Sequence, residues 1–244
     1  MSLFLLNDLP RLYYIGGEEF PDPFEPYEDG LIGISSRLSV PMLVEGYSKG
    51  FFPWYQDDMG YFHWFRLDER MLIFPGEVTE TKKLRQKLRS SNWEFKFNTR
   101  FEEVIEWCSK VPRRGESGTW INDEFIRAYT ELHRKGYAVS VESYYKGELV
   151  GGFYGVWINN YFSGESMFHL KPDASKLALI FFGNILAPSL GIEVIDCQVP
   201  SGHLGRMGGK VFKPEEFIPI IQRASGYSPR SMPSNSTPNL RKGE

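Results

Sequence analysis

Three successive runs of strand-forming residues, separated by very short turns, dominate the middle of the chain. AVSVESYY spans residues 138–145, ELVGGFYGVW spans 148–157 and NYFSGESMF spans 160–168. Lys146-Gly147 and Asn159-Asn160 stand between the runs, and such pairs favour tight hairpin turns. Strands joined by turns this short pair with their neighbours in antiparallel fashion. The sequence therefore predicts a meander of three antiparallel strands around which the rest of the chain packs.

The segments before this meander predict one further strand and two helices. Residues 93–98 have strand composition, and residues 100–108 have helical periodicity. Asn122 is suited to cap a helix that runs to Arg134, because its side chain can accept a hydrogen bond from the first turn. Gly136 then supplies the residue that commonly follows a helix end.

The segments after the meander alternate between helix and strand. Asp173 is a predicted cap for a helix over residues 174–187, with Pro188 as its stop. The apolar run at residues 191–199 predicts a buried strand, and a last helix is expected to begin near Pro214. Strands and helices in this order predict a mixed α/β (α+β) fold.

The two ends of the chain differ from its middle. Residues 1–75 are rich in Pro, Gly and aromatic side chains and show one clear helical pattern, from Val40 to Lys49. We expect a small, loop-rich N-terminal subdomain there and a second domain over residues 76–224. Residues 225–244 are mostly Ser, Pro and Asn with little to bury, which predicts a disordered tail.

The overall charge limits the kinds of partner. The chain has 244 residues, 41% of them hydrophobic, and a formal net charge of -3, so nucleic-acid binding would have to be local. Cys108 and Cys197 form no CxxC pair, which indicates a reducing compartment, and we expect a cytoplasmic protein. No run of about eighteen apolar residues predicts a membrane span. Aromatic residues make up 16% of the chain, so some rings are expected to line a pocket.

Patterns typical of metal or nucleotide cofactors are missing from the sequence. The four histidines have no HExxH or similar ligand spacing. The stretch GRMGGKV at residues 205–211 encloses too few residues for a phosphate-binding loop and lacks the final Ser or Thr. No GxGxxG fingerprint occurs. We therefore expect no metal and no cofactor.

A carboxylate and an amide stand two residues apart in the apolar run that ends near residue 199. Strand periodicity places Asp196 and Gln198 on one face and Ile195 and Cys197 on the other. A buried Asp must be paired, hydrogen-bonded or functional, so a structural role that holds a loop stays open. Glu165 is a second carboxylate among strand-forming aromatics, and two such positions in neighbouring strands favour an active site.

A basic amphipathic helix is predicted from Thr79 to Ser90. Leu84 and Leu88 are four residues apart, and five cations surround them. Such a run is either a solvated face or, together with Arg113 and Arg114, a contact surface for phosphates. The cations of this helix are Lys82, Lys83, Arg85, Lys87 and Arg89.

Taken together, several segments over roughly residues 18 to 220 make the chain resemble the leucyl/phenylalanyl-tRNA-protein transferases. The most specific are Gly164-Glu165-Ser166-Met167-Phe168 and the Asp196-Cys197-Gln198-Val199 run. The remaining matches are Phe20-Pro21-Asp22-Pro23, Gly46 to Trp54, Gly118-Thr119-Trp120-Ile121, Leu149 to Val156, Ala174-Ser175-Lys176 and Ile195.

This resemblance implies a C-terminal domain with the Gcn5-related N-acetyltransferase fold, with a mixed, mainly antiparallel sheet. It also implies an activity: Leu, Phe or Met passes from charged tRNA to an acceptor protein that begins with Arg or Lys, which marks that protein for N-degron degradation. The implied tRNA-binding residues are Lys82, Lys83, Arg85 and Arg89. The implied lining of the aminoacyl pocket is Trp54, Trp120, Phe153, Phe162, Met167, Phe182 and Ile195.

The resemblance also implies catalytic roles for Asp196, Gln198 and Glu165. We expect Asp196, oriented through Gln198, to draw the proton from the acceptor's α-amino group. Glu165 is expected to hold an amino group by a charge-assisted hydrogen bond. No metal is required, because an aminoacyl ester is already activated and a deprotonated amine is a competent nucleophile. We expect a monomer.

The chain departs from the family's pattern at two places. Where the family shows a Trp-Ser-Pro-Asp-Pro-Arg run, residues 65–70 read Phe-Arg-Leu-Asp-Glu-Arg and keep only Asp68 and Arg70. Arg206-Met207 stands where Ser-Leu is common. These differences bear on acceptor recognition and amino-acid preference more than on the class of reaction.

Three other functions remain to be separated from this one. An acyl-CoA N-acetyltransferase needs a Gly-rich turn at a helix start, whereas residues 169–175 contain no glycine and include Pro172. A peptidoglycan-type aminoacyl-tRNA transferase is not expected to share the two most specific segments. An inactive tRNA-binding module would not need Asp196, Gln198 and Glu165 together.

Overall fold

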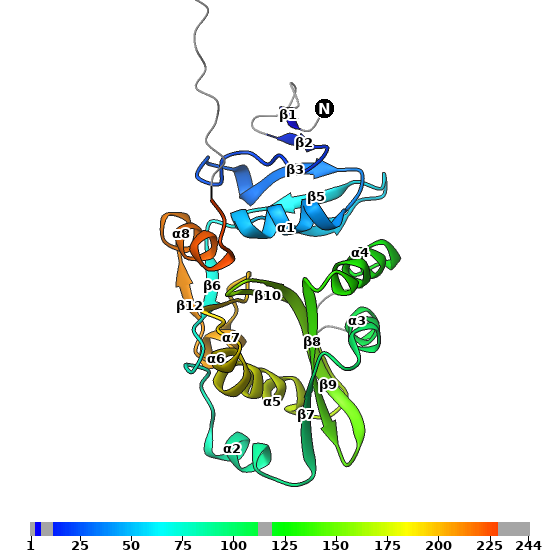
Figure 1. The fold of residues 1–244 in the computed structure, drawn as a ribbon, viewed down its shortest axis with the longest axis vertical. Helices are drawn as coiled ribbons and strands as arrows, with labels where there is room; N and C mark the ends of the chain where they lie inside the picture. The colour runs from blue at the N-terminus through cyan, green and yellow to red at the C-terminus, as the bar shows by residue number, and fades with distance from the viewer. Residues whose placement is uncertain (1–2, 6–11, 112–118, 229–244) are drawn as a thin grey trace, which may run out of the picture.

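Two β-sheets, one formed mainly by each end of the chain, organise the molecule. The computed structural model describes residues 3–5, 12–111 and 119–228. The two sheets lie one above the other along the long axis, with the N-terminal sheet at the top of Figure 1. Within the described residues, no helix combines the length and apolar character needed to cross a bilayer.

The N-terminal part contains a sheet with one covering helix, and the sequence predicted only the helix. Its strand order is β1-β2-β3-β5-β4. The prediction missed these strands because they are only three to five residues long and β5 is mostly buried, which removes the alternation of polar and apolar residues. The strands are β1 (Leu3–Leu5), β2 (Tyr13–Ile15), β3 (Leu31–Ser35), β4 (Phe52–Gln56) and β5 (Phe62–Phe65), and the short 3-10 helix η1 is Glu28–Gly30.

Helix α1 (Val40–Lys49) forms where the sequence predicts it. A proline in the first turn needs no hydrogen-bond donor there, which favours the start of the helix. Gly50 ends it with a φ of 93°, a left-handed conformation that glycine adopts without a Cβ clash. The helix buries Met42, Leu43 and Tyr47, and so directs Tyr47 toward the interior of the molecule.

The second sheet contains the predicted meander, which is confirmed. Its order is β12-β6-β11-β10-β9-β8-β7, and the pair β10–β11 is parallel while the other neighbours are antiparallel. The predicted mixed α/β fold with a mainly antiparallel sheet is therefore confirmed. The strands are β6 (Arg70–Ile73), β7 (Trp93–Phe97), β8 (Ala138–Tyr145), β9 (Glu148–Ile158), β10 (Tyr161–His169), β11 (Val194–Asp196) and β12 (Lys210–Phe212).

Strand β6 bears on the expected division of the chain. It precedes residue 76 in the sequence, yet it pairs with β11 and β12 in the C-terminal sheet. The boundary at residue 75 and the tail at 225–244 stay predictions. Ser225 is the last residue of α8, and residues 229–244 lie outside the described part of the chain.

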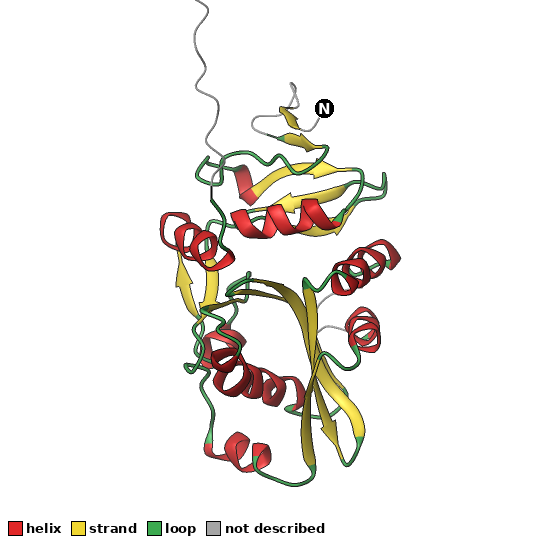
Figure 2. Cartoon of the chain, in the orientation of Figure 1, coloured by secondary structure: helices red, strands yellow, loops and turns green. Residues whose placement is uncertain are grey.

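Helices cover both faces of the C-terminal sheet, as Figure 2 shows. Helices α3 and α4 pack on one face of β8 and β9, and α5 packs on the other. The helices are α2 (Lys82–Leu88), α3 (Phe101–Lys110), α4 (Asp123–Arg134), α5 (Ala174–Phe181), the π-helical segment η2 (Phe182–Leu186), α6 (Ala187–Ser189), α7 (Gly202–Arg206) and α8 (Pro214–Ser225).

The predicted helix caps have different outcomes. Asn122 does cap α4, since its side chain accepts a hydrogen bond from the Phe125 amide at 3.1 Å. Asp173 does occupy the N-cap position of α5, as predicted, but its side chain makes no capping hydrogen bond. Its carboxylate instead binds Lys87 at 2.7 Å and Lys176 at 3.4 Å. Pro188 does not stop the helix at its own position, because it lies in the first turn of α6, where a missing N–H is tolerated.

The close packing around Gly155, where β9 pairs with β10, predicts a large loss of stability for one added methyl group. A Cβ on Gly155 would stand 2.3 Å from the Ser163 carbonyl oxygen and 2.4 Å from the Phe162 ring. We expect Gly155→Ala to lower the free energy of unfolding by about 1 to 3 kcal/mol. Gly164, its cross-strand partner, is the matched control: a Cβ there meets no atom closer than 3.6 Å. Equal melting temperatures for the two variants would contradict this packing.

Candidate active site

A cavity of about 1080 Å³ opens between β10, the start of α5, the end of β11 and α7. Its apolar part and its charged part occupy the same space, so one ligand can contact both. The apolar side chains include Phe153, Phe162, Met167, Leu179 and Ile195. The ionisable side chains include Glu165, Asp173, Lys176, His203 and Arg206.

Four of the seven residues predicted to bind an aminoacyl side chain line this cavity: Phe153, Phe162, Met167 and Ile195. Phe182 lies behind them rather than in the wall. Its ring centroid is 4.5 Å from that of Phe162 and 5.4 Å from that of Phe153. Phe182 therefore supports the two lining rings and sets their positions.

The structure does not bring Trp54 or Trp120 to the cavity. Trp54 lies on β4 and packs edge-on against Phe65, with ring centroids 5.1 Å apart. Trp120 packs edge-on against Phe125 of α4, at 5.0 Å. Both rings pack against the hydrophobic core cluster that contains residues of the N-terminal sheet and of α4, and not against the cavity. The neighbouring Gly118 lies outside the described residues.

Asp196 is completely buried and its carboxylate is held by three partners. The Arg70 guanidinium binds it with two groups, Nε at 2.9 Å and Nη2 at 2.7 Å from the Asp196 oxygens. The Tyr161 hydroxyl donates to Oδ2 at 2.7 Å, and the backbone N–H of Gln198 donates to Oδ1 at 2.8 Å. Asp196 does not line the cavity, so its carboxylate does not face the space in which a substrate would bind.

Gln198 connects Asp196 to the cavity. Its backbone has a φ of 57°, a left-handed conformation that is uncommon for a residue with a side chain. Its side-chain amide donates to Glu165 Oε1 at 2.9 Å and to Ser163 Oγ at 3.2 Å. The three predicted catalytic residues therefore form one continuous hydrogen-bonded chain, with Asp196 at the buried end and Glu165 at the cavity.

Glu165 lines the cavity at a bulge in β10, where the register with β9 shifts between Gly164 and Ser166. Its carboxylate accepts hydrogen bonds from the Ser163 hydroxyl and the Tyr129 hydroxyl, each at 3.1 Å. Burial raises the pKa of Glu165 to about 7, although the nearby Tyr47 hydroxyl and the hydrogen bonds from Ser163 and Tyr129 act in the opposite direction. The carboxylate therefore changes charge near neutral pH.

The sequence analysis missed several polar side chains that hold this group. Arg70 appears there only as a retained residue of an altered run, and Tyr47, Tyr129 and Tyr161 do not appear as functional candidates. The hydroxyls of Tyr47 and Tyr129 are joined by a hydrogen bond of 2.5 Å, and the Tyr129 hydroxyl in turn donates a hydrogen bond to the Glu165 carboxylate. A buried tyrosine in a helix has no local pattern, so these residues are recognisable only once α1, α4 and β10 are assembled.

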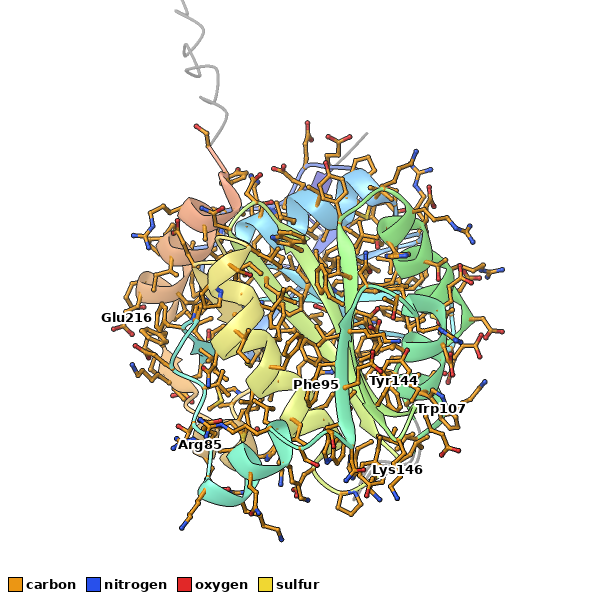
Figure 3. The ribbon with its side chains drawn as sticks, turned by 60° about the horizontal axis from the view of Figure 1, so that its bottom comes forward. Arg85, Phe95, Trp107, Tyr144, Lys146 and Glu216 are labelled. Carbon is orange, nitrogen blue, oxygen red and sulfur yellow. The ribbon has the colours of Figure 1, made fainter. Side chains whose placement is uncertain are left out.

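The basic helix α2 is exposed and lies at the lower edge of Figure 3, where side chains extend away from the molecule near Arg85. Arg85 pairs with Glu80, while Lys82, Lys83 and Arg89 are also exposed. Lys87 binds Asp173, which lines the cavity, so α2 is attached to the cavity rim. Arg113 and Arg114 lie outside the described residues.

An apolar cavity with a near-neutral carboxylate in its wall is typical of an enzyme that binds an apolar group and transfers a proton beside it. Within the described ranges, no group of three or more His, Cys, Asp or Glu side chains could hold a metal ion. The chain belongs to the leucyl/phenylalanyl-tRNA protein transferase family, whose model matches residues 72–222. The model of that family's N-terminal domain matches residues 36–68. The chain is accordingly an aminoacyltransferase.

Curated members of this family match the sequence of this chain over most of their length. The leucyl/phenylalanyl-tRNA–protein transferase of Neisseria meningitidis (serogroup C) is 42% identical over 81% of this chain and 84% of its own. That of Syntrophobacter fumaroxidans is 40% identical over 83% and 86%. A solved GCN5-related N-acetyltransferase-like protein from Streptococcus suis has a TM-score of 0.31 at 15% identity, over 74% of this chain and 68% of that one.

Because the Arg70–Asp196 pair is buried, we expect the loss of its cation to cost more stability than the loss of a cation at the surface. Arg70→Met leaves Asp196 without its cation, so we expect the free energy of unfolding to fall by about 3 to 5 kcal/mol. Lys210→Met removes an exposed cation that pairs with Glu77, and should cost less than about 1 kcal/mol. Urea unfolding of both variants measures the difference. Similar midpoints would show that the Arg70–Asp196 pair does not stabilise the fold.

Proposed function

We propose that this protein transfers Leu, Phe or Met from aminoacyl-tRNA to an acceptor protein that begins with Arg or Lys. The observation that carries the proposal is the apolar cavity with Glu165 in its wall. The family to which the chain belongs is described by transfer from leucyl- and phenylalanyl-tRNA to protein, and such a cavity suits the side chains concerned. The described residues therefore offer both a place for the amino acid and a titratable group beside it.

The cavity is large enough for more than an amino acid. At about 1080 Å³ it exceeds what a Leu or Phe side chain fills, which leaves room for the terminal nucleoside that carries the ester. Phe162, Met167 and Ile195 provide the apolar contacts. An apolar pocket discriminates by only about 1 to 3 kcal/mol per methylene, so exclusion of β-branched Ile and Val depends on the shape of this wall.

The exposed cations on and next to α2 are the proposed binding site for the phosphates of the tRNA body. Lys82, Lys83 and Arg85 are exposed on α2, and Arg89 is exposed at its C-cap. Phosphates bind such clusters even on a protein of negative net charge. Because Lys87 of the same helix pairs with Asp173 at the cavity rim, a tRNA held on α2 lies close to the cavity.

Asp196, Gln198 and Glu165 are proposed to serve the reaction as one unit. The Asp196 carboxylate, fixed by Arg70, holds the Gln198 backbone amide, and the Gln198 side chain holds Glu165 at the cavity. In this arrangement Asp196 is a positioning residue. A proton acceptor that faces the substrate is required separately.

Several further aspects of the function follow from these substrates. Charged tRNA is a cytoplasmic molecule, so we place the reaction in the cytoplasm. A new N-terminal Leu or Phe would mark the acceptor for N-degron degradation. We propose that the enzyme acts as a monomer, because a single chain contains the whole hydrogen-bonded chain from Arg70 to Glu165.

A transfer assay tests the reaction directly. The protein is mixed with radiolabelled Leu-tRNA and one of two peptides that differ only in a first residue of Arg or Ala. We expect labelled peptide with Arg first, in excess over Ala by roughly tenfold or more, which corresponds to about 1.4 kcal/mol. Binding of tRNA with no labelled peptide would favour an inactive tRNA-binding module. Acetylation of the peptide from acetyl-CoA would favour the N-acetyltransferase alternative.

Salt dependence tests the assignment of α2. The triple variant Lys82→Gln, Lys83→Gln, Arg89→Gln should bind tRNA more weakly, and the slope of log affinity against log salt should fall by about 0.7 to 0.9 for each phosphate contact removed. The matched control is Lys110→Gln, Arg134→Gln, Lys135→Gln, which removes the same charge from α3 and the end of α4. An equal change of slope in both variants would remove the tRNA site from α2.

A further inference from the structure

The proton acceptor of the reaction needs a group that a substrate can reach, and Asp196 is not such a group. Both of its oxygens already accept hydrogen bonds: Oδ1 from Arg70 and Gln198, and Oδ2 from Arg70 and Tyr161. Each carboxylate oxygen offers about two lone-pair positions, so the donors fill the positions available. A proton taken up by Asp196 would also leave Arg70 as an unpaired buried cation.

Glu165 meets the requirements that Asp196 does not. It belongs to the cavity wall, and its neighbours in that wall include the apolar Phe162 and Met167. Among the residues that the structure describes, its oxygens are oriented by neutral donors: Oε1 by the Gln198 side-chain amide and the Ser163 hydroxyl, and Oε2 by the Tyr129 hydroxyl. A carboxylate without a cationic partner can take up a proton without breaking an ion pair.

We propose that Glu165 is the general base that removes the proton from the acceptor's α-amino group, and that Tyr129 and Tyr47 tune its basicity. This inference rests on the proposed function. Tyr129 donates to Glu165 Oε2 and shares a hydrogen bond with Tyr47, which α1 contributes from the N-terminal part of the chain. Both halves of the molecule thus build the environment of one carboxylate.

The step balances without any further reactant. The amine nitrogen forms a bond with the ester carbonyl carbon, and its proton moves to a Glu165 carboxylate oxygen. The bond between that carbon and the ribose oxygen then breaks. Glu165 returns the proton to the departing ribose hydroxyl, and the product is a new peptide bond. One carboxylate serves first as base and then as acid, which suits a group that titrates near the working pH.

The charge state of Glu165 depends on groups from every side. From the protein interior it faces Tyr47, Tyr129 and Asp196, and from the cavity it shares walls with Asp173, Lys176, His203 and Arg206. Burial favours the protonated carboxyl, and Tyr hydroxyls that donate to the carboxylate favour the ionised form, which yields a pKa of about 7. As a base, Glu165 is active when ionised, so the rate of transfer should rise as pH rises through 7.

Variants of Glu165 test the base itself. The rate of a single turnover is measured with saturating Arg-peptide and Leu-tRNA between about pH 5.5 and 9. Glu165→Gln should lose about 10² to 10⁴-fold in rate and lose the rise near neutrality, with tRNA affinity unchanged. Glu165→Asp keeps a carboxylate and should retain a rise at a lower rate. A Glu165→Gln enzyme that keeps its maximal rate and only raises KM for the peptide would overturn the proposal and show an anchoring role.

The tyrosine pair is tested by a shift in pH rather than by a loss of rate. Tyr129→Phe removes a donor to the ionised carboxylate, so the rise in rate should move to higher pH by about one unit or more. Tyr27→Phe is the matched control: it also removes a phenol hydrogen bond of a buried side chain, to the Asp22 carbonyl at 2.5 Å, but Tyr27 is not part of the cavity wall that contains Glu165. The pH profile of this control should not move.

The possible results distinguish the role of Glu165 from the proposed aminoacyl transfer itself. The acceptor's own amino group titrates identically with every variant, so only a change in Glu165 moves one profile against another. If Tyr129→Phe and Tyr27→Phe give the same profile, the tuning role is excluded. If the unaltered protein transfers no amino acid to any peptide, the proposed function fails, and that result is distinct from active enzymes whose profiles ignore Glu165.

Discussion

The buried ion pair between Arg70 and Asp196 is the interaction on which the rest of the structure depends. Its guanidinium lies 4.7 Å from the ring of Phe52 in the N-terminal sheet and 5.7 Å from the ring of Phe217 in α8. It also donates to the Gly50 carbonyl at the end of α1. Because an unpaired buried charge is so costly, these elements must assemble together around the pair. The N-terminal part is thereby joined to the C-terminal sheet at the point where the site begins.

A series of hydrogen bonds connects this ion pair to the cavity and fixes the side chains between them. Asp196 fixes the Gln198 backbone, and the Gln198 side chain fixes Glu165, which the bulge in β10 presents to the cavity. The parallel pairing of β10 with β11 brings Ser163 opposite Asp196. Strand β11 therefore supplies Asp196, at the buried end of the hydrogen-bonded series, and β10 supplies Glu165, at its cavity end. A low-dielectric interior strengthens each of these hydrogen bonds and also raises the pKa of Glu165. Burial in the low-dielectric interior therefore both holds these side chains in place and sets the basicity of Glu165.

Local patterns predicted the regular elements well. The meander was predicted from its two-residue turns, α4 from the cap at Asn122, and α8 from its proline start, because each depends on residues close in sequence. The strands of the N-terminal sheet were missed, since each is too short to show a period. Asp173 stands at the predicted cap position of α5, but its carboxylate binds the distant Lys87 in place of the helix backbone. Local sequence thus predicted where the helix begins, whereas the partner of the cap side chain depended on a residue far along the chain.

The sequence by itself determined the family, the order of most helices and strands, and the presence of Asp196, Gln198 and Glu165 near one another. Only the tertiary structure decided that Asp196 faces Arg70 instead of the cavity, that Trp54 and Trp120 pack elsewhere, and that Tyr47 and Tyr129 reach Glu165. Arg70 and Asp196 are 126 positions apart, and Tyr47 and Tyr129 are 82. Residue type and spacing show which groups can ionise, whereas their charge and reactivity depend on neighbours that the folded chain brings from far away.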